Sequence, residues 1–358
     1  MSRYLVTLII ACSCWNLQAQ EVKQMDFEAY DPPSTLVVPE HPLQRAKFPF
    51  VDAHSHHWNM DKQDLSQLIR EMDSLNMRIV VNLSGRGGAA LKAMMDNIKK
   101  YGYEKRIALF TNISFNGIDE PDWAANTVKQ IEYDVANGAK GLKIFKNLGL
   151  SVKDKNGKRI PIDDPRLDPV WAKCGELGIP VFIHSADPEP FWWPMDAQNE
   201  RWLELKTHAG RKRSDTDPAP WAQIIEEQHN MFRKHPKTKF INAHFGWYAN
   251  NLVKLSQLLD EMPNMYIELG AIIAELGRQP RQAKAFFEKY QDRILFGKDS
   301  YVPEEYYTYF RVLETADEYF PYYKRYHAFW RMYGLDLPDK VLEKVYYRNA
   351  MKIIPGLN

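Results

Sequence analysis

Val51-Asp52-Ala53-His54-Ser55-His56-His57 places a group of histidines at the end of a short apolar run that begins at residue 49. Side chains two positions apart on a strand point the same way, so we expect His54 and His56 to project together and His57 to the other side. Two imidazoles placed in this way can bind one divalent metal. An H-x-H triplet also occurs by chance, so its meaning depends on the rest of the chain.

Seven further apolar runs rich in β-branched residues follow, with stretches of helical period between them. The eight predicted strands span residues 49–53, 78–83, 107–113, 141–145, 180–183, 239–243, 265–269 and 294–297. The predicted helices span residues 64–75, 89–101, 123–136, 221–235, 252–262 and 280–290. This alternation indicates an α/β fold, a (β/α)8 TIM barrel within residues 48–358. An open doubly wound sheet is the alternative, but no glycine-rich phosphate loop follows the first strand.

Polar side chains also end three of the later runs. His184 follows the fifth run, His244 the sixth and Asp299 the eighth. The carboxyl ends of barrel strands meet on one face, which is where such barrels build their active sites. One histidine after an apolar run is usually a hydrogen-bonded structural residue, whereas four histidines and a carboxylate on one face indicate a functional group.

Taken together, these motifs resemble the amidohydrolase superfamily of metal-dependent hydrolases. The motifs are V-D-A-H-S-H at 51–56, I-H at 183–184, N-A-H-F-G at 242–246, F-G-K-D-S at 296–300 and Y-R-N-A at 347–350. The chain is most similar to the amidohydrolase-related branch, which includes decarboxylases similar to aminocarboxymuconate semialdehyde decarboxylase. The resemblance covers about residues 48 to 355.

The resemblance implies a metal-dependent enzyme that uses water to cleave a C–N or C–O bond of an amide, lactone or ester. Non-oxidative decarboxylation of a carboxylate-bearing ring compound is the alternative, because the same motifs serve both reactions. A binding protein that lost the chemistry is disfavoured, since every expected type of ligand residue is present.

Site roles follow from the same resemblance. It implies that His54, His56 and His184 bind the metal and that Asp299 touches it and handles the proton of the water. His244 would orient or polarise the substrate, or bind a second metal. Three imidazoles and one carboxylate suit one Zn²⁺ ion, although Mn²⁺, Fe²⁺ and Ni²⁺ also bind such sets.

Three lysines lie close to the ends of predicted strands. Lys143, in the fourth run, would bridge two metals if it were carboxylated, as in some branches of the superfamily. We favour the simpler hypothesis of a cation that contacts substrate or pairs with Asp299. Lys146 should face away from the site if the strand is regular. In the superfamily that the chain resembles, a small residue commonly precedes the aspartate that corresponds to Asp299. Lys298 stands there instead, so the resemblance does not indicate which substrate is bound.

The cations near the predicted site favour a small, polar or anionic substrate. Arg86, just past the second run, joins Lys143 and Lys298 on the active face. The positive charge of these three residues is more than the metal ligands need for neutrality, so it would favour an anionic substrate. Pairing of the three cations with nearby carboxylates is an equally open alternative.

The long fifth loop, residues 185–220, is rich in tryptophan. Trp192 and Trp193 could form the apolar wall of a pocket, with aromatic packing of a cap as the alternative. The basic run at residues 211–213 is expected to be a solvated face. Histidines outside the strand ends, His327 among them, are expected to be structural or solvated.

The composition excludes several classes of protein. The chain has 358 residues, of which 45% are hydrophobic and 26% charged, as in a globular protein. Its formal net charge is +1, so nucleic acid is not expected as a partner. The expected partner is a small-molecule substrate, and homo-oligomerisation stays open.

The first 47 residues precede the predicted barrel. Residues 1–19 resemble a secretory signal peptide, so we expect export to the periplasm or the exterior, in preference to lipid anchoring at Cys12. No stretch is long and apolar enough for a transmembrane helix. Residues 20–47 carry four prolines and are expected to form an extended N-terminal arm.

Overall fold

The computed structural model describes residues 24–327 and 330–357. Residues 1–35 and 36–358 form two units, and each is described by itself. The first unit contains one short 3₁₀ turn, η1 (Phe27–Ala29), and the predicted signal peptide lies outside the described residues. Everything below concerns the second unit.

Parallel strands form the centre of the second unit. They are β1 (Phe50–Ser55), β2 (Met77–Asn82), β3 (Ile107–Leu109), β4 (Thr111–Asn112), β5 (Leu142–Ile144), β6 (Val181–Ile183), β7 (Phe240–Asn242), β8 (Met265–Glu268) and β9 (Ile294–Leu295). They pair in the orders β1-β2-β3 and β4-β5-β6-β7-β8-β9, and only Phe110 separates β3 from β4. Backbone hydrogen bonds from Ala53 N to Phe296 O (2.9 Å) and from Asp299 N to His54 O (2.7 Å) join the two edges. The predicted (β/α)8 barrel is therefore confirmed.

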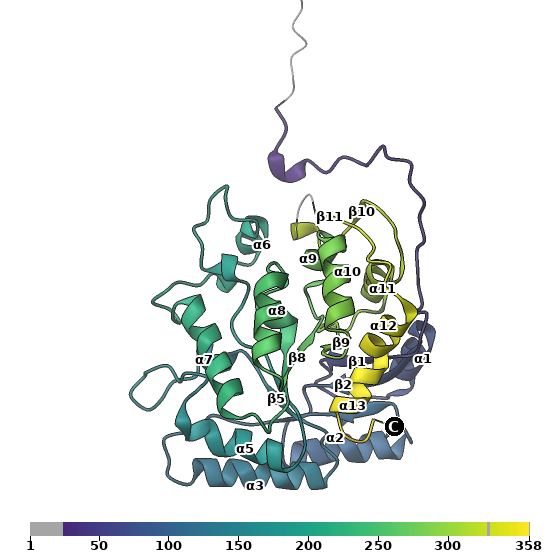
Figure 1. Cartoon of the computed structure of the whole chain (residues 1–358). Coiled ribbons are helices and arrows are strands. Elements are labelled where there is room, and N and C mark those ends of the chain that lie inside the picture. The colour runs from purple at the N-terminus through teal and green to yellow at the C-terminus, as the bar shows by residue number, and fades with distance from the viewer. Residues whose placement is uncertain (1–23, 328–329, 358) are drawn as a thin grey trace, which may run out of the picture. The chain divides into compact units, whose positions relative to one another are not determined.

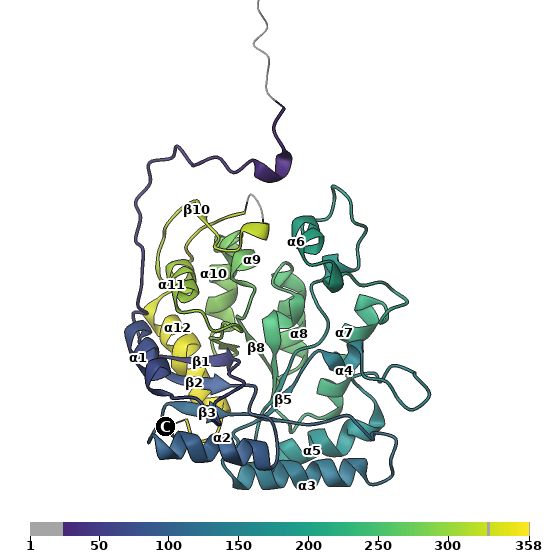
Figure 2. The ribbon, with the colours of Figure 1, turned by 180° about the vertical axis from the view of Figure 1, so that it is seen from behind.

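Helices follow the strands and surround them (Figures 1 and 2). They are α1 (Ser66–Leu75), α2 (Ala89–Lys100), α3 (Trp123–Ala136), α4 (Asn147–Leu150), α5 (Asp168–Glu176), α6 (Trp202–Thr207), α7 (Trp221–Lys234), α8 (Leu252–Glu261), α9 (Ile273–Gly277), α10 (Pro280–Lys289), α11 (Tyr306–Glu314), α12 (Asp339–Glu343) and α13 (Asn349–Ile353). All six predicted helices are present. The sequence analysis missed α5, because it is short and contains both Pro169 and Gly175.

Shorter elements complete the chain between and beside these helices and strands. They are the 3₁₀ turns η2 (Pro165–Leu167), η3 (Glu189–Phe191), η4 (Ala209–Arg211), η5 (Ala243–Trp247), η6 (Pro303–Glu305) and η7 (Arg325–His327), the π turn η8 (Lys344–Arg348), and the hairpin strands β10 (Phe320–Pro321) and β11 (Arg331–Met332). The long fifth loop is therefore partly ordered, with η3, α6 and η4 inside it.

Strand residues alternate between two buried hydrophobic clusters. One cluster fills the barrel and includes Val51, Ala53, Ile79, Val81, Phe110, Phe182, Ile241 and Leu295. The other lies between strands and helices and includes Phe50, Val80, Leu109, Ile144, Val181, Phe240, Ile267 and Phe296. Burial on both faces explains why the strands read as nearly continuous apolar runs.

The C-terminal segment closes the interior of the barrel. Ala350, Ile353, Ile354 and Leu357 belong to the same cluster as the inward-facing strand residues. Asn349 fastens the segment to β9, since its side-chain amide donates to the carbonyl oxygens of Gln291 and Ile294, both at 2.7 Å. The end of the chain is thus part of the core.

The first strand departs from regular pairing just before its histidines. Residues 52–55 of β1 lie opposite residues 80–82 of β2, so β1 carries one extra residue there. A bulge of this kind re-aims the neighbouring side chains. The ring of His54 accordingly lies against the inward-facing ring of Phe182, with centroids 4.7 Å apart. The sequence analysis assumed a regular strand and did not foresee this irregularity.

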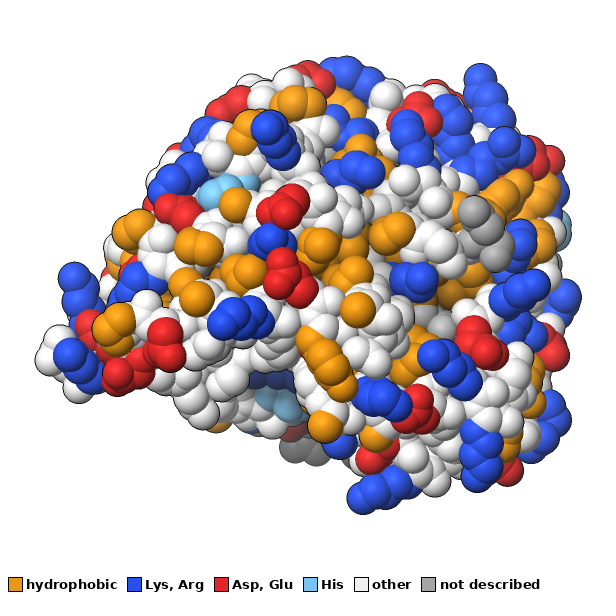
Figure 3. Space-filling model, turned by 90° about the horizontal axis from the view of Figure 1, so that it is seen from below, with side chains coloured by type: hydrophobic (Ala, Val, Ile, Leu, Met, Phe, Trp, Pro, Cys, Tyr) orange, Lys and Arg blue, Asp and Glu red, His pale blue; other side chains and the backbone are white. Residues whose placement is uncertain are grey.

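The second half of the predicted arm contacts the barrel unit. His41 donates its backbone N–H to Asp317 (2.7 Å), Arg45 donates to the side chain of Asn76 (3.0 Å), and Lys47 pairs with Asp339 (2.5 Å). On the face shown in Figure 3, basic and acidic side chains are interspersed, as the near-zero net charge leads one to expect. Within the described ranges, no helix has the length and apolar character that crossing a membrane requires.

We predict that Ile354→Ala destabilises the barrel, because Ile354 is fully buried where the C-terminal segment meets the inward-facing strand residues. Large-to-small core substitutions of this kind cost about 2–5 kcal/mol of unfolding free energy. Urea denaturation followed by circular dichroism measures the loss. Val253→Ala, at a position that is 60% exposed, is the control and should change stability little. Equal stability of the two variants would contradict the assignment of residue 354 to the core.

Candidate active site

Five predicted residues meet at the carboxyl ends of the strands. His54 and His56 come from β1 and its end, His184 follows β6, His244 lies in η5 after β7, and Asp299 follows β9. One ligand atom each from His54, His244 and Asp299 lies within 4.8 Å of the others. The tightest group therefore contains His244, which the sequence analysis assigned to the substrate or to a second metal.

A buried carboxylate on β8 orients His54. Glu268 Oε2 lies 2.9 Å from His54 Nδ1, and both side chains are completely buried. This contact leaves His54 Nε2 facing Asp299 Oδ1 at 3.2 Å. Glu268 also accepts hydrogen bonds from the backbone N–H groups of Gly270 and His244. The carboxylate therefore fixes one histidine ring and two loops at once.

The other histidines are held by similar contacts. His56 Nδ1 lies 2.7 Å from Ser84 Oγ, which leaves its Nε2 3.4 Å from Asp299 Oδ1. His244 Nδ1 lies 2.7 Å from the carbonyl oxygen of Gly270, and its Nε2 lies 3.2 Å from His184 Nδ1. Each ring thus has one nitrogen positioned by the protein and one turned towards another member of the group. As the sequence predicts, His57 does not join them, and its ring lies against Tyr301.

Several residues of the site have left-handed backbone conformations. His244 and Phe245 have φ values of 57° and 53°, and Asp299 has a φ of 83°. This region costs ordinary residues roughly 1–2 kcal/mol each, and aspartate tolerates it better than most. Gly246 has a φ of 59°, and a Cβ there would lie 2.4 Å from Asn242 Nδ2, so a larger residue would force the Asn242 side chain to move. The packed fold holds these turns in place, as is typical of functional sites.

Two glycines make room for the contact between Glu268 and His54. A Cβ on Gly297 would lie 2.5 Å from Glu268 Oε1 and 2.8 Å from the Cβ of His54. A Cβ on Gly270 would also lie 2.5 Å from Glu268 Oε1. The glycine before Lys298 in the F-G-K-D-S motif therefore has a steric function.

The charges around the site favour a cation at its centre. Burial alone lowers the pKa of His54, but the carboxylates of Glu268 and Asp299 outweigh it and raise this pKa to about 9. Burial lowers the pKa values of His56 and His244 to about 4, so both are neutral at pH 7. Neutral imidazoles are the form that binds metals.

Lys143 lies in the barrel beneath this group. Its Nζ is 4.5 Å from the centre of the Phe182 ring and has no hydrogen-bond partner among the described residues. Burial lowers its pKa to about 8, although Asp299 and Glu268 act in the opposite direction. Lys143 is therefore near the acids of the site without forming an ion pair with them.

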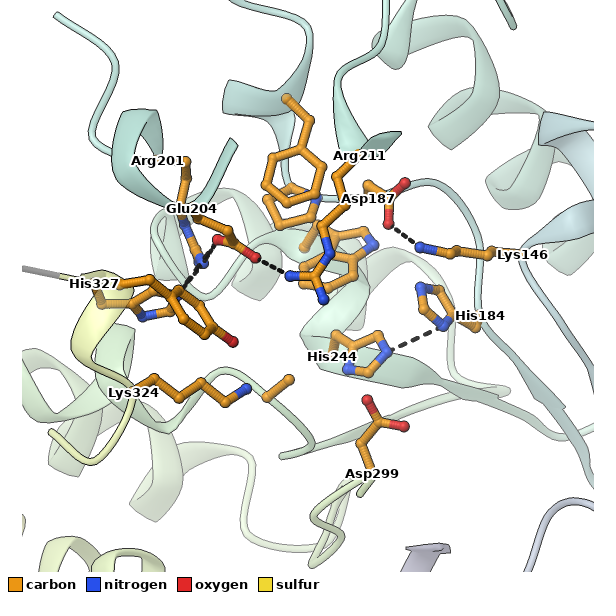
Figure 4. A pocket seen from close by; sticks show the side chains of 15 residues that line it. Lys146, His184, Asp187, Arg201, Glu204, Arg211, His244, Asp299, Lys324 and His327 are labelled. Atoms are coloured by element: carbon orange, nitrogen blue, oxygen red, sulfur yellow. Dashed lines mark hydrogen bonds and ion pairs between the residues drawn. The ribbon is translucent and has the colours of Figure 1, made fainter. Parts of the chain in front are cut away.

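A cavity of about 160 Å³ opens beside His184, His244 and Asp299 (Figure 4). Its other walls come from loops that follow β5, β6, β7 and β8 and from the segment between β10 and β11. The residues that line it besides the three named are Lys146, Asp187, Pro188, Phe191, Arg201, Glu204, Arg211, Trp247, Ala271, Lys324, Tyr326 and His327. The cavity thus combines the histidine and aspartate group with a wall of charged side chains.

Lys298, Trp192 and Trp193 do not line this cavity. The ammonium of Lys298 is buried against Glu305 and donates to the carbonyl oxygen of Ser300 at 2.6 Å. Trp192 donates its indole N–H to the carbonyl oxygen of Ala219 at 2.8 Å, and Trp193 is 38% exposed. Phe191 and Trp247 form the aromatic wall instead.

Arg86 lies near the site but not in the cavity lining. Its Nη2 donates to the carbonyl oxygen of Trp58 at 2.7 Å, and the Trp58 ring stacks on that of His56. Its guanidinium therefore supports a residue next to the histidines.

The sequence analysis missed most of the charged wall. Lys146 faces the cavity and pairs with Asp187, although a regular strand would turn it away. Arg211 belongs to a run that was expected to be solvated, and His327 to the histidines that were set aside; both line the cavity. Arg213, from the same run, pairs with Asp187 at 3.0 Å. Long loops carry no periodic signal from which such contacts could be predicted.

Comparison with known proteins agrees with this geometry. Residues 114–355 match the family model described as amidohydrolase, a range that includes His184, His244 and Asp299 and begins after the β1 histidines. No curated protein matches the chain in sequence.

Among solved structures, the chain is similar to a dihydroxybenzoic acid decarboxylase from Polaromonas sp. with bound manganese and the inhibitor 2-nitroresorcinol (TM-score 0.53, 14% identity, 86% of this chain and 96% of that chain). It is also similar to a putative amidohydrolase from Staphylococcus aureus (TM-score 0.51, 15% identity, 85% of this chain and 99% of that chain). At such identities the likeness establishes a shared fold and leaves the substrate open. Because the family model spans more than half of the sequence, the chain belongs to the amidohydrolase family.

Proposed function

We propose that the protein is a metal-dependent hydrolase that cleaves a C–N or C–O bond of a small polar or anionic substrate. The observation that carries this proposal is the convergence of ligand atoms from His54, His244 and Asp299 within 4.8 Å at the edge of a cavity. His56 and His184 lie next to this group through their contacts with Asp299 and His244.

The residues present fit a divalent metal. His184 Nε2 is buried and has no hydrogen-bond partner among the described residues, which is costly for a polar atom. His54 Nε2 is buried too and faces Asp299 Oδ1 at 3.2 Å. Imidazole nitrogen with a carboxylate suits Zn²⁺, and Mn²⁺ is the alternative. We propose one ion, with a second only if Lys143 is carboxylated. A bound ion of this kind lowers the pKa of water towards 7 and polarises a carbonyl group.

Asp299 is suited to move the proton of the attacking water. Its side chain is 36% exposed, towards the cavity, while His54 and His56 hold it from the other side. The pKa of Asp299 lies well below its usual range, because the nearby histidines outweigh the effect of burial. The carboxylate can therefore accept a proton as water adds to the carbonyl carbon, and can deliver it to the leaving nitrogen or oxygen.

The dimensions of the cavity support a small substrate. Its volume is about 160 Å³. A protein cavity of ~150 Å³ accommodates a benzene molecule. A compound with about one ring therefore fits beside Asp299, with Phe191 and Trp247 as flat apolar walls.

We predict that His54→Ala removes most of the bound metal, because it deletes the ligand that Glu268 orients. Elemental analysis of purified wild type and variant, after equal dialysis, gives the metal content per chain. His208→Ala is the matched control, since His208 is an exposed residue of the fifth loop. Equal metal content in the two variants would show that the metal, if any, binds elsewhere.

We predict that Gly297→Ala weakens metal binding without changing any ligand. The added methyl group would press on Glu268 and His54 and shift the imidazole. Competition with a chromophoric chelator measures the affinity, which should fall by about 10- to 100-fold, as for other disturbed outer-shell partners of metal ligands. Gly210→Ala is the control, because a Cβ there meets no atom within 4 Å. An unchanged affinity in Gly297→Ala would remove Glu268 from the support of the site.

We predict that Asp299→Asn lowers kcat by about 10²- to 10⁴-fold on any substrate that the wild type turns over. A panel of esters, lactones, amides and aromatic carboxylates, assayed for product and for CO₂ release, identifies that substrate. Asp260→Asn, at a position that is 58% exposed, is the control. Near-normal turnover by Asp299→Asn would exclude it from proton transfer. CO₂ release without hydrolysis would replace the proposed reaction by decarboxylation.

A further inference from the structure

The charged wall of the cavity contains four cations, and three of them are paired. Lys146 pairs with Asp187, Arg201 with Glu204 and Glu275, and Arg211 with Glu204. Lys324 is different. Among the residues that the structure describes, no carboxylate oxygen lies within ion-pair distance of its Nζ, although Lys324 lines the cavity.

The acids of the wall are already shared between cations. Glu204 accepts from Arg201 Nη1 at 2.8 Å through one oxygen and from Arg211 Nη1 at 2.6 Å through the other. Arg211 also contacts the Tyr326 hydroxyl. A guanidinium has five N–H donors, so these two contacts leave Arg211 able to bind a further acceptor. The wall on this side of the cavity therefore has spare donors and an excess of positive charge.

Figure 4 shows how these groups face the cavity. The charged ends of Lys324 and Arg211 point into the space beside His244, and Asp299 lies at the bottom of the same space. Lys324 is half-buried, and Asp299, Glu305 and Glu204 favour its charge without reaching ion-pair distance, so its ammonium can still bind an anion directly. A planar two-oxygen anion could accept from the ammonium and from one edge of the guanidinium together.

We propose that Lys324 and Arg211 bind a carboxylate group of the substrate and so set the specificity of the cavity for organic anions. That an anion binds in the cavity follows from the cavity alone. That this anion is the substrate rests on the proposed function. It differs from the anion site expected from the sequence, since neither Arg86 nor Lys298 lines the cavity.

Benzoate and benzamide test the proposal, because they have nearly the same shape and differ in charge. Isothermal titration calorimetry measures both probes against wild type, Lys324→Met and Lys324→Arg, with inorganic phosphate as a third probe. Lys289→Met is the control, since Lys289 is 60% exposed on α10. All titrations are made on the protein as purified and again after treatment with a chelator.

We expect Lys324→Met to weaken benzoate binding by about 10- to 100-fold, the range for a hydrogen bond to a charged group. Lys324→Arg and Lys289→Met should retain the affinity for benzoate, and benzamide should bind all four proteins alike. Benzamide binding also shows that each variant is folded at the cavity.

Three results would overturn the proposal. They are the absence of benzoate binding to the wild type, an equal loss of benzoate and benzamide in Lys324→Met, and phosphate binding as tight as benzoate binding. Binding of benzoate that depends on Lys324 in the chelated protein supports the subsite even if no metal or hydrolysis is found. Failure of the subsite is therefore distinguishable from failure of the proposed reaction.

Discussion

The buried contact between Glu268 and His54 is the interaction on which the site depends. Both side chains are inaccessible to solvent, and removing one partner of such a pair commonly costs about 3–5 kcal/mol. The same carboxylate receives backbone N–H groups from the loops after β7 and β8. Glu268 therefore orients the His54 ring, holds the loops after β7 and β8, and makes the electrostatic potential around the ring more negative. Residues 270 and 297 are glycines, and a Cβ at either position would lie 2.5 Å from Glu268 Oε1.

Chemistry and recognition are assigned to different parts of the chain. The histidine and aspartate group comes from strand ends, which the barrel holds rigidly. The charged wall comes mainly from α6, η4 and the segment around η7, which lie outside the barrel. Glu204 of α6 joins them, since it pairs with Arg211 of η4 at 2.6 Å and lies 3.4 Å from His327 of η7. Active-site loops of (β/α)8 barrels vary while their strand ends persist. In the proposal made above, the strand ends carry the chemistry and the wall selects the substrate.

The sequence predicted the parts of this site that are tied to strand ends. His54, His184, His244 and Asp299 could be located because each ends an apolar run, and the barrel brings such ends together. Glu268 escaped notice as a ligand support because it sits inside an apolar run of its own.

The features that the sequence did not predict have physical causes as well. The direction of Lys298 depends on Glu305, which offers it a buried partner away from the cavity. Lys324 and Arg211 lie in loops whose positions are set by tertiary contacts. The bulge in β1 depends on pairing with β2, and neither strand shows it alone.

The backbone hydrogen bonds that join β1 to the segment after β9 have a consequence for biosynthesis. A ribosome releases the two histidines of β1 early, but Asp299 and the C-terminal segment that fills the barrel emerge only after nearly all of the other strands. Until then the nascent chain contains the β1 histidines, but Asp299 is not yet beside them. Bringing together residues so distant in the chain requires a large loop closure. The ligand set of the proposed metal site is therefore complete only once the fold is complete, so metal binding there would be coupled to folding.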